Sequence, residues 1–258
     1  MLKFQARFER WPVTVLLGVL TLALAACGND KGSDNGLAIV VNDSNGAAYD
    51  PIIDPANFVS NIDNPYFTLK PGSILVYEGV NESKEKVRKE VEVTREKKTI
   101  RGVSALVIRD RVWEGGELVE DTDDWYAQDK DGNVWYFGED SKQIEKGKVA
   151  STEGSWQDGV KGAKAGIIMK GRPQVGDAYR QEFLKGEAEG LGQIVGINKQ
   201  VTTKQKSYDN CIVIKEWTPQ EPKITEQKFY CPDAGNLVFE EKTAGESGRM
   251  ELIEIRTS

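Results

Sequence analysis

The chain contains no histidine among its 258 residues. This absence excludes Ser-His-Asp and Cys-His nucleophilic catalysis, metal sites that use imidazole, and the side chain that most often transfers protons near neutral pH. Cysteine is also scarce, with three residues at Cys27, Cys211 and Cys231. A catalytic site would have to use carboxylates, a Ser-Lys pair or tyrosine, and none of these forms an intact motif. The sequence therefore favours a protein that is not an enzyme and that uses no cofactor.

Long apolar runs are rare too, and the one that exists lies at the N-terminus. Residues 11–26 are uncharged and rich in Val and Leu, and they follow the basic residues Lys3, Arg7 and Arg10. Such a stretch is shorter than the about 20 residues of a membrane span and fits the apolar part of a secretory signal. Residues 24–27 (Leu-Ala-Ala-Cys) resemble the lipobox of bacterial lipoprotein precursors. We expect cleavage after residue 26 and lipidation of Cys27. An ordinary signal peptide with a chance cysteine and an uncleaved anchor are the alternatives.

The residues after Cys27 predict a tether followed by one folded domain. Residues 28–36 are polar, rich in glycine and without apolar periodicity, as in a flexible linker. We divide the chain into a signal peptide (1–26), a lipidated cysteine with its tether (27–50) and a single β-rich envelope domain (51–258). Gly28, rather than Asp, follows the cysteine. By resemblance to enterobacterial sorting, this favours the outer membrane over the inner membrane.

The charge of the chain argues against nucleic acid as a partner. Removing residues 1–26 takes away three basic residues and one acidic residue, which leaves a net charge of −9 over 232 residues. An acidic protein of this kind repels phosphate backbones. The partners that we expect are the membrane, through the lipid anchor, and either a lipid or another envelope protein.

The two remaining cysteines fit one disulfide bond. Export places them in an oxidising compartment. Residues 209–217 and 224–231 are typical of strands around a turn-rich segment, and a hairpin centred on Glu221 places Cys211 opposite Cys231 and Val213 opposite Phe229. Directly opposed residues of antiparallel strands are about 4.5–5.5 Å apart, as a disulfide requires.

The rest of the chain has the pattern of an all-β protein. Apolar and polar residues alternate from about Leu75 onward, most clearly in residues 87–94. Residues 124–137 hold two aromatic runs around Asp131-Gly132, which predicts a tight hairpin with Tyr126 opposite Tyr136. The glycine-rich region 151–176 predicts a long loop or a short helical turn. We expect an antiparallel β-barrel or half-barrel of roughly ten to twelve strands with few short helices, and a sandwich is the alternative.

Three segments resemble a set of uncharacterised bacterial envelope proteins, many of them lipoproteins. They are the opening 62–72 with its Asn-Pro-Tyr-Phe-x-Leu-x-Pro-Gly pattern and Tyr77-Glu78-Gly79, the hairpin 124–139 (DWYAQDKDGNVWYFGE), and the ending 230–238. The ending departs from the usual Gly-Val-Gly-Leu-Val form at residues 233–236. More loosely, these segments are similar to periplasmic half-barrels related to the lipoprotein carrier LolA and the pilus-associated protein TapB. The resemblance implies an antiparallel sheet curled around an apolar concavity, and it implies no catalytic residues.

The aromatic residues of the hairpin are the candidates for contact with a ligand or a partner. They are Trp125, Tyr126, Trp135, Tyr136 and Phe137. Because successive residues of a strand point to opposite faces, one set belongs to the core. The other set faces a cavity, a partner or water, unless both sets only pack in the core.

A calcium loop is a further candidate beside the same hairpin. Asp129, Asp131 and Asn133 alternate like the first ligands of such a loop, and Asp140 stands at its twelfth position. However, Gly132 stands at the fourth position rather than the sixth, and a hairpin turn explains the same residues.

Charged runs occur on both sides of this region. Residues 120–124 (Glu-Asp-Thr-Asp-Asp) could supply paired carboxylates for glycoside hydrolysis, but alternation points neighbouring acids to opposite faces, and we interpret the run as a solvated edge strand. The basic residues of 84–101 are interleaved with glutamates, which predicts cross-strand ion pairs.

Three hypotheses about function follow. The first is a non-enzymatic membrane-anchored lipoprotein whose barrel or half-barrel binds an apolar ligand or an envelope partner, with Trp125 and Trp135 in the contact. The second is a structural or assembly subunit of an envelope complex, joined through the sheet edge or the hairpin. The third is a carboxylate-dependent hydrolase that uses Asp121, Asp123 or Asp124.

Overall fold

The computed structural model describes residues 49–257. The predicted signal peptide, Cys27 and nearly all of the tether lie outside the described residues. Tyr49 and Asp50, which we assigned to the tether, contact the folded domain: the Tyr49 hydroxyl donates to the carbonyl of Ala165, and Asp50 pairs with Lys164. No helix in the part of the chain that the structure describes is long and apolar enough to span a membrane.

The described chain is almost entirely antiparallel β-structure, which confirms the predicted fold class. Among residues 49–257 there is one turn of 3-10 helix, η1 (Pro55–Asn57), and there are eighteen strands. The strands are β1 (Phe58–Val59), β2 (Ile62–Asn64), β3 (Phe67–Leu69), β4 (Ser73–Val80), β5 (Lys86–Ile100), β6 (Val103–Glu114), β7 (Glu117–Asp129), β8 (Val134–Glu145), β9 (Lys148–Ser151), β10 (Trp156–Gln157), β11 (Lys164–Met169), β12 (Ala178–Arg180), β13 (Glu182–Phe183), β14 (Leu191–Thr202), β15 (Ser207–Trp217), β16 (Thr225–Cys231), β17 (Asn236–Ala244) and β18 (Arg249–Thr257).

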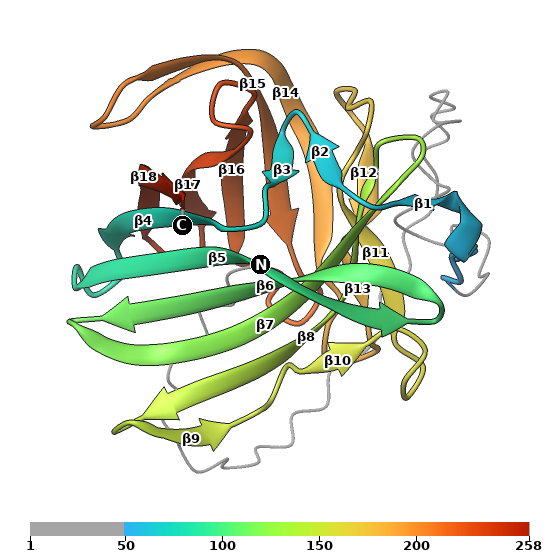
Figure 1. Cartoon of the computed structure of the whole chain (residues 1–258). Coiled ribbons are helices and arrows are strands. Elements are labelled where there is room, and N and C mark those ends of the chain that lie inside the picture. The colour runs from blue at the N-terminus through green and yellow to red at the C-terminus, as the bar shows by residue number, and fades with distance from the viewer. Residues whose placement is uncertain (1–48, 258) are drawn as a thin grey trace, which may run out of the picture. The chain divides into compact units, whose positions relative to one another are not determined.

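The main sheet curls into a barrel because its two ends belong to one short segment. Its path holds thirteen strands in the order β12-β14-β15-β16-β17-β18-β4-β5-β6-β7-β8-β11-β13 (Figure 1). β12 pairs with β14 at one end, β13 pairs with β11 at the other, and only Gln181 separates β12 from β13. At this seam a Cβ on Gly166 would lie 2.4 Å from the carbonyl carbon of Gln181, so glycine permits the close approach of the two backbones.

One end of the barrel is covered by the hairpin β2–β3 (Figure 1). The amide of Asn64 donates to the carbonyls of Gly132 and Lys170, and the backbone N–H of Thr68 donates to the carbonyl of Gly235. The ring of Phe67 contacts both Tyr126 on β7 and Tyr230 on β16, which have five strands between them in the sheet. The three segments that carry the family resemblance therefore meet at this end, where they close it.

Both hairpins predicted in detail are present. Cys211 and Cys231 form the predicted disulfide, with a Cα–Cα distance of 4.2 Å, and Val213 lies opposite Phe229. In the β7–β8 hairpin, Gly132 adopts a positive φ of 84° and Tyr126 lies opposite Tyr136. The turn sets this register, and an extra residue on β8, Phe137, shifts it only beyond this pair, between Trp125 and Tyr126.

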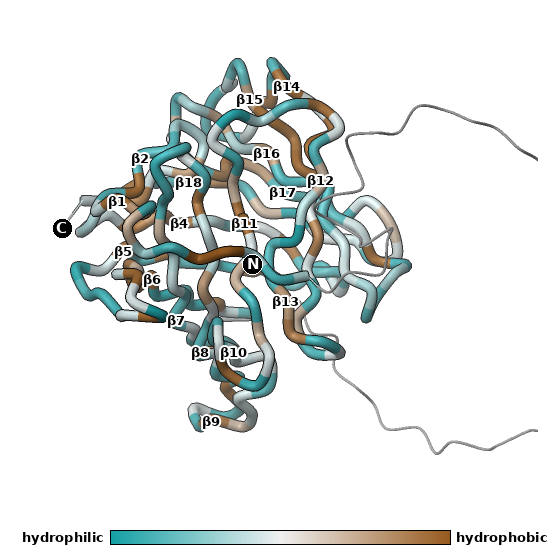
Figure 2. The backbone as a smooth tube through the Cα atoms, turned by 90° about the vertical axis from the view of Figure 1, so that its right-hand side faces the viewer, coloured by the Kyte–Doolittle hydropathy of each residue, from teal (hydrophilic) through white to brown (hydrophobic). Residues whose placement is uncertain are grey.

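Two expectations about the middle of the chain are wrong. The region 151–176 contains β10 and β11, and β11 is part of the barrel wall. The acidic run 120–124 is not an edge strand, because β7 lies between β6 and β8. Its residues alternate as we expected, but the inward set is buried: Asp124 is 3% exposed. In Figure 2, hydrophilic and hydrophobic residues interchange along the barrel strands. Several of the charged residues on these strands are buried, among them Lys89, Asp110 and Lys228.

Candidate functional site

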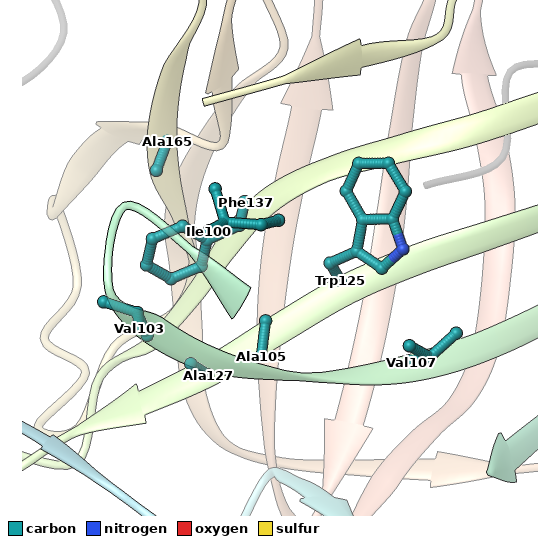
Figure 3. Packing of buried hydrophobic residues seen from close by; sticks show 8 residues of the cluster. All are labelled: Ile100, Val103, Ala105, Val107, Trp125, Ala127, Phe137 and Ala165. Carbon is teal, nitrogen blue, oxygen red and sulfur yellow. The ribbon is translucent and has the colours of Figure 1, made fainter. Parts of the chain in front are cut away.

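The five candidate aromatic residues divide between two packing layers. Tyr126 and Tyr136 stack inside the barrel with ring centroids 4.8 Å apart. Trp125 and Phe137 point to the outer face of the sheet and pack in a cluster with residues of β5, β6 and β11 (Figure 3). Trp135 is partly buried against this cluster, where the ring of Phe58 covers it at 6.4 Å. Both sets of aromatic residues are therefore packed, and Trp135 lies against Phe58 of β1.

The interior of the barrel is polar and charged. Lys228 on β16 pairs with Glu216 at 2.6 Å and with Glu226 at 3.0 Å, and all three side chains are at most 11% exposed. Burial alone would raise the pKa of Glu226, but the charges of Lys228 and Lys242 outweigh it and lower the pKa to about 2. Elsewhere in the interior, Lys89 on β5 forms a buried ion pair with Asp110 on β6. This lining differs from the apolar concavity that the family resemblance implies.

The inward acids of β7 have perturbed pKa values. Asp124 accepts a hydrogen bond of 2.6 Å from the hydroxyl of Tyr136, and burial raises the pKa of Asp124 to about 6. Burial likewise raises the pKa of Glu120 to about 7, and Glu120 accepts a hydrogen bond from Thr122. Both acids hydrogen-bond to neighbouring side chains of the barrel wall, and burial disfavours their charged forms.

The calcium candidates do not gather into a site. The carboxylate of Asp129 accepts from the backbone N–H groups of Asp131 and Asn133 and from the side chains of Asn133 and Trp135. Asp140 lies further along the hairpin, opposite Asp123, and pairs with Lys142. Among residues 49–257 there is no group of three or more His, Cys, Asp or Glu side chains that could hold a metal ion. The hairpin turn accounts for the positions of these residues.

A charged cleft lies on the outer wall of the barrel, and the sequence did not indicate it. Its volume is about 600 Å³, within the range of small-ligand sites. It forms where β5 leaves its register with β6, between Val93 and Lys97, so that the strand bends away from the wall. The residues that line it are Gly72, Ile74, Glu92, Val93, Thr94, Arg95, Glu96, Val107, Arg109, Asp121, Asp123 and Lys142.

Two acids of the cleft have pKa values that shift in opposite directions. Asp121 accepts two hydrogen bonds from Arg109, at 2.8 and 2.6 Å, and this contact lowers the pKa of Asp121. Partial burial raises the pKa of Asp123, two residues further along the same face. The ion pair places fixed donors and acceptors side by side in the cleft.

One of the predicted aromatic residues borders this cleft. Trp125 lies opposite Val107, which lines the cleft, and it is two residues from Asp123. The ammonium group of Lys98 sits over its indole, 3.2 Å from the ring centroid. The basic segment that holds Lys98 also forms the predicted cross-strand ion pairs, such as Arg88 with Glu78 on β4 and Glu90 with Arg111 on β6.

Comparison with known proteins adds little to these observations. No protein-family model matches the chain, and no curated protein matches it. Two solved structures are similar to it at 14% identity, each over 74% of this chain and 98% of the other. One is an inferred exported protein with a YmcC-like fold from Bacteroides fragilis, with a TM-score of 0.44, and the other is an inferred lipoprotein from Parabacteroides distasonis, with a TM-score of 0.40. Likenesses this distant carry no argument about the function of this chain.

Proposed function

We propose that this protein is a lipid-anchored, non-enzymatic binding protein of the bacterial envelope, and that the charged cleft on the outer wall of its barrel is the ligand site. The pattern of residues 1–27 supports the anchor, and Gly28 favours the outer membrane. The signal sequence and the disulfide between Cys211 and Cys231 agree with an oxidising compartment.

We choose the cleft as the ligand site because side chains occupy the interior of the barrel. The interior holds the Tyr126–Tyr136 stack and the ion pairs of Lys228, and the hairpin β2–β3 covers one end. An apolar ligand inside the barrel would have to displace these groups. The cleft on the outer wall, by contrast, presents polar side chains at its surface, so a polar ligand suits it better than an apolar one.

The anchor is tested by feeding cells a labelled fatty acid. We expect label in the wild-type protein and none in Cys27→Ser, with the wild-type protein in the membrane fraction. An unlabelled wild-type protein, or one that keeps Met1, would contradict the anchor.

The cleft is tested by photocrosslinking in cells. A photoreactive residue at Arg95, which is exposed and lines the cleft, should give an adduct that mass spectrometry identifies. The same residue at Lys199, exposed on β14 in another part of the barrel, is the matched control. The same set of adducts from both positions would remove the cleft as the binding site.

A carboxylate-dependent hydrolase is the second candidate, because Asp121 and Asp123 lie in one cleft with pKa values shifted apart. Asp124 has no place in this version, since it faces Tyr136 inside the barrel. Pooled glycoside and ester substrates decide the question. Turnover that is lost in Asp121→Asn and Asp123→Asn would support an enzyme, and equal background in all variants would exclude it.

A further inference from the structure

We infer that the ligand of the cleft is a saccharide, one ring of which lies on the indole of Trp125 after Lys98 has moved aside. This inference rests on the proposed function, because it names the ligand class of the same site. Three features of the described residues support it: the position of the indole, the nature of its cover and the balance of charge in the cleft.

Trp125 stands next to residues of the cleft in the sheet. Its neighbour on β6 is Val107, which lines the cleft, and Asp123 lies two residues away on the same outward face. Its neighbour on β8 is Gly138, which has no side chain to cover the ring. The indole thus lies in one row with cleft residues, and β10 lies beside Gly138 on the far side of β8.

Lys98 lies over one face of the ring, which also packs in the apolar cluster on the outer face of the sheet. Trp125 is only 5% exposed, while the ammonium of Lys98 lies 3.2 Å from its ring centroid. Loss of hydration lowers the pKa of this lysine, so its position costs solvation, and the nearby charges of Asp123 and Asp140 offset the cost only in part. Cation–π contacts at partly exposed sites are weak, and the lysine stem is flexible. A ligand with a better contact for the ring can therefore displace Lys98.

The charges of the cleft suit a neutral ligand with many hydroxyl groups. The lining holds four acids (Glu92, Glu96, Asp121 and Asp123) and three bases (Arg95, Arg109 and Lys142), so neither sign dominates. Arg109 and Asp121 hold each other in a two-bonded pair, which presents donors and acceptors in a fixed arrangement. Sugar hydroxyls donate and accept at once, and the apolar face of a sugar ring stacks on an aromatic ring.

The test uses a panel of neutral hexose and N-acetylhexosamine oligomers with the lipid-anchored protein in detergent. Binding is followed by calorimetry and by the change in tryptophan fluorescence. We expect at least one oligomer to bind wild-type protein, and Lys98→Ala to bind it at least 3-fold more tightly because the ring is uncovered. Asp121→Asn should bind it at least 10-fold more weakly, and the control Lys199→Ala should match the wild type. Thermal unfolding of each variant shows that the fold is intact.

A second probe separates the saccharide from a cationic ligand. Tetramethylammonium chloride can replace the ammonium of Lys98 on the ring but offers no hydroxyl groups. Saturable binding of this salt without binding of any oligomer would overturn the inference, as would equal affinities of wild type and Lys98→Ala for the oligomer. If the crosslinker at Arg95 captures a specific partner while no oligomer binds, the proposed function stands and the saccharide is excluded.

Discussion

Lys228 offers the sharpest test of the idea that ion pairs inside the barrel hold its walls together. Its ammonium group lies 2.6 Å from Glu216 on the neighbouring strand β15 and 3.0 Å from Glu226 on its own strand β16. The side chain of Lys228 is 4% exposed. Lys228→Met keeps most of the volume and leaves two buried carboxylates without their main partner. Removing one member of a buried ion pair costs about 3–5 kcal/mol. Gln181 still donates to Glu216 and Lys242 still pairs with Glu226, so we expect a loss near the lower end, about 3 kcal/mol at pH 7.

The pH dependence of this loss of stability is a second, independent test of the ion pairs. In the wild type the pKa of Glu226 is lowered to about 2, so its contribution to stability is complete above its ordinary value of 4.5 and is lost as the pH falls towards 2. In Lys228→Met the same carboxyl takes up a proton at higher pH, because burial then raises its pKa. The difference in unfolding free energy between the two proteins should therefore narrow on acidification.

Urea denaturation followed by tryptophan fluorescence at pH 7 and pH 3 measures both effects. Lys148→Met, at an exposed position on β9, is the matched control and should change stability by less than about 0.5 kcal/mol. Combining Lys228→Met with Glu216→Gln should recover part of the loss, since residue 216 is then neutral and Glu226 keeps its pair with Lys242. A loss below about 1 kcal/mol at pH 7, or a difference that does not narrow at pH 3, would refute the reasoning.

Three further predictions concern the disulfide bond, the seam of the barrel and a buried carboxyl group. Replacing Cys211 and Cys231 with serine removes the disulfide and should lower the unfolding free energy by about 3 kcal/mol, measured by denaturation with and without reductant. Gly166→Ala places a methyl group 2.4 Å from the backbone of Gln181 and should cost at least about 1–3 kcal/mol, with faster amide hydrogen exchange in β12 and β13 than in β16. Because the pKa of Asp124 rises from 3.8 to about 6 on folding, this carboxyl lowers stability as the pH increases between those values; Asp124→Asn should remove a decline of about 3 kcal/mol from the pH–stability curve, and an unchanged curve would exclude that assignment.

Local register was predictable from the sequence because it depends on residues close together in the chain. The turn at 218–223 and the period of two fixed Val213 opposite Phe229, and so Cys211 beside Cys231. The turn around Gly132 likewise placed Tyr126 opposite Tyr136, and the register shifts only further along the strands, beyond this pair. Where both partners lie within one hairpin, composition and spacing were sufficient.

The candidate site was not predictable because it depends on which face of the sheet is enclosed. Glu226 and Lys228 alternate with Gln227 as on a solvated strand face, yet these charged residues are buried, because Glu216 and Lys242 on other strands neutralise them. The cleft depends on the loss of register at residues 94–96 of β5, a stretch with no glycine or proline to signal it. Trp125 was found as a candidate from its aromatic character, but its cover by Lys98 follows from the bend of β5.

The pairing of β4 with β18 has a consequence for how the protein is made. Ser73 lies opposite Thr257 and Val80 opposite Arg249, so the whole stretch 81–248 must be available before these two strands can meet. A contact between such distant parts of a chain forms late and slows folding. Until then the unpaired backbone of β4 is exposed along eight residues, a template for pairing with other chains. A newly made copy therefore presents this edge to neighbouring chains until residues 249–257 have paired with it.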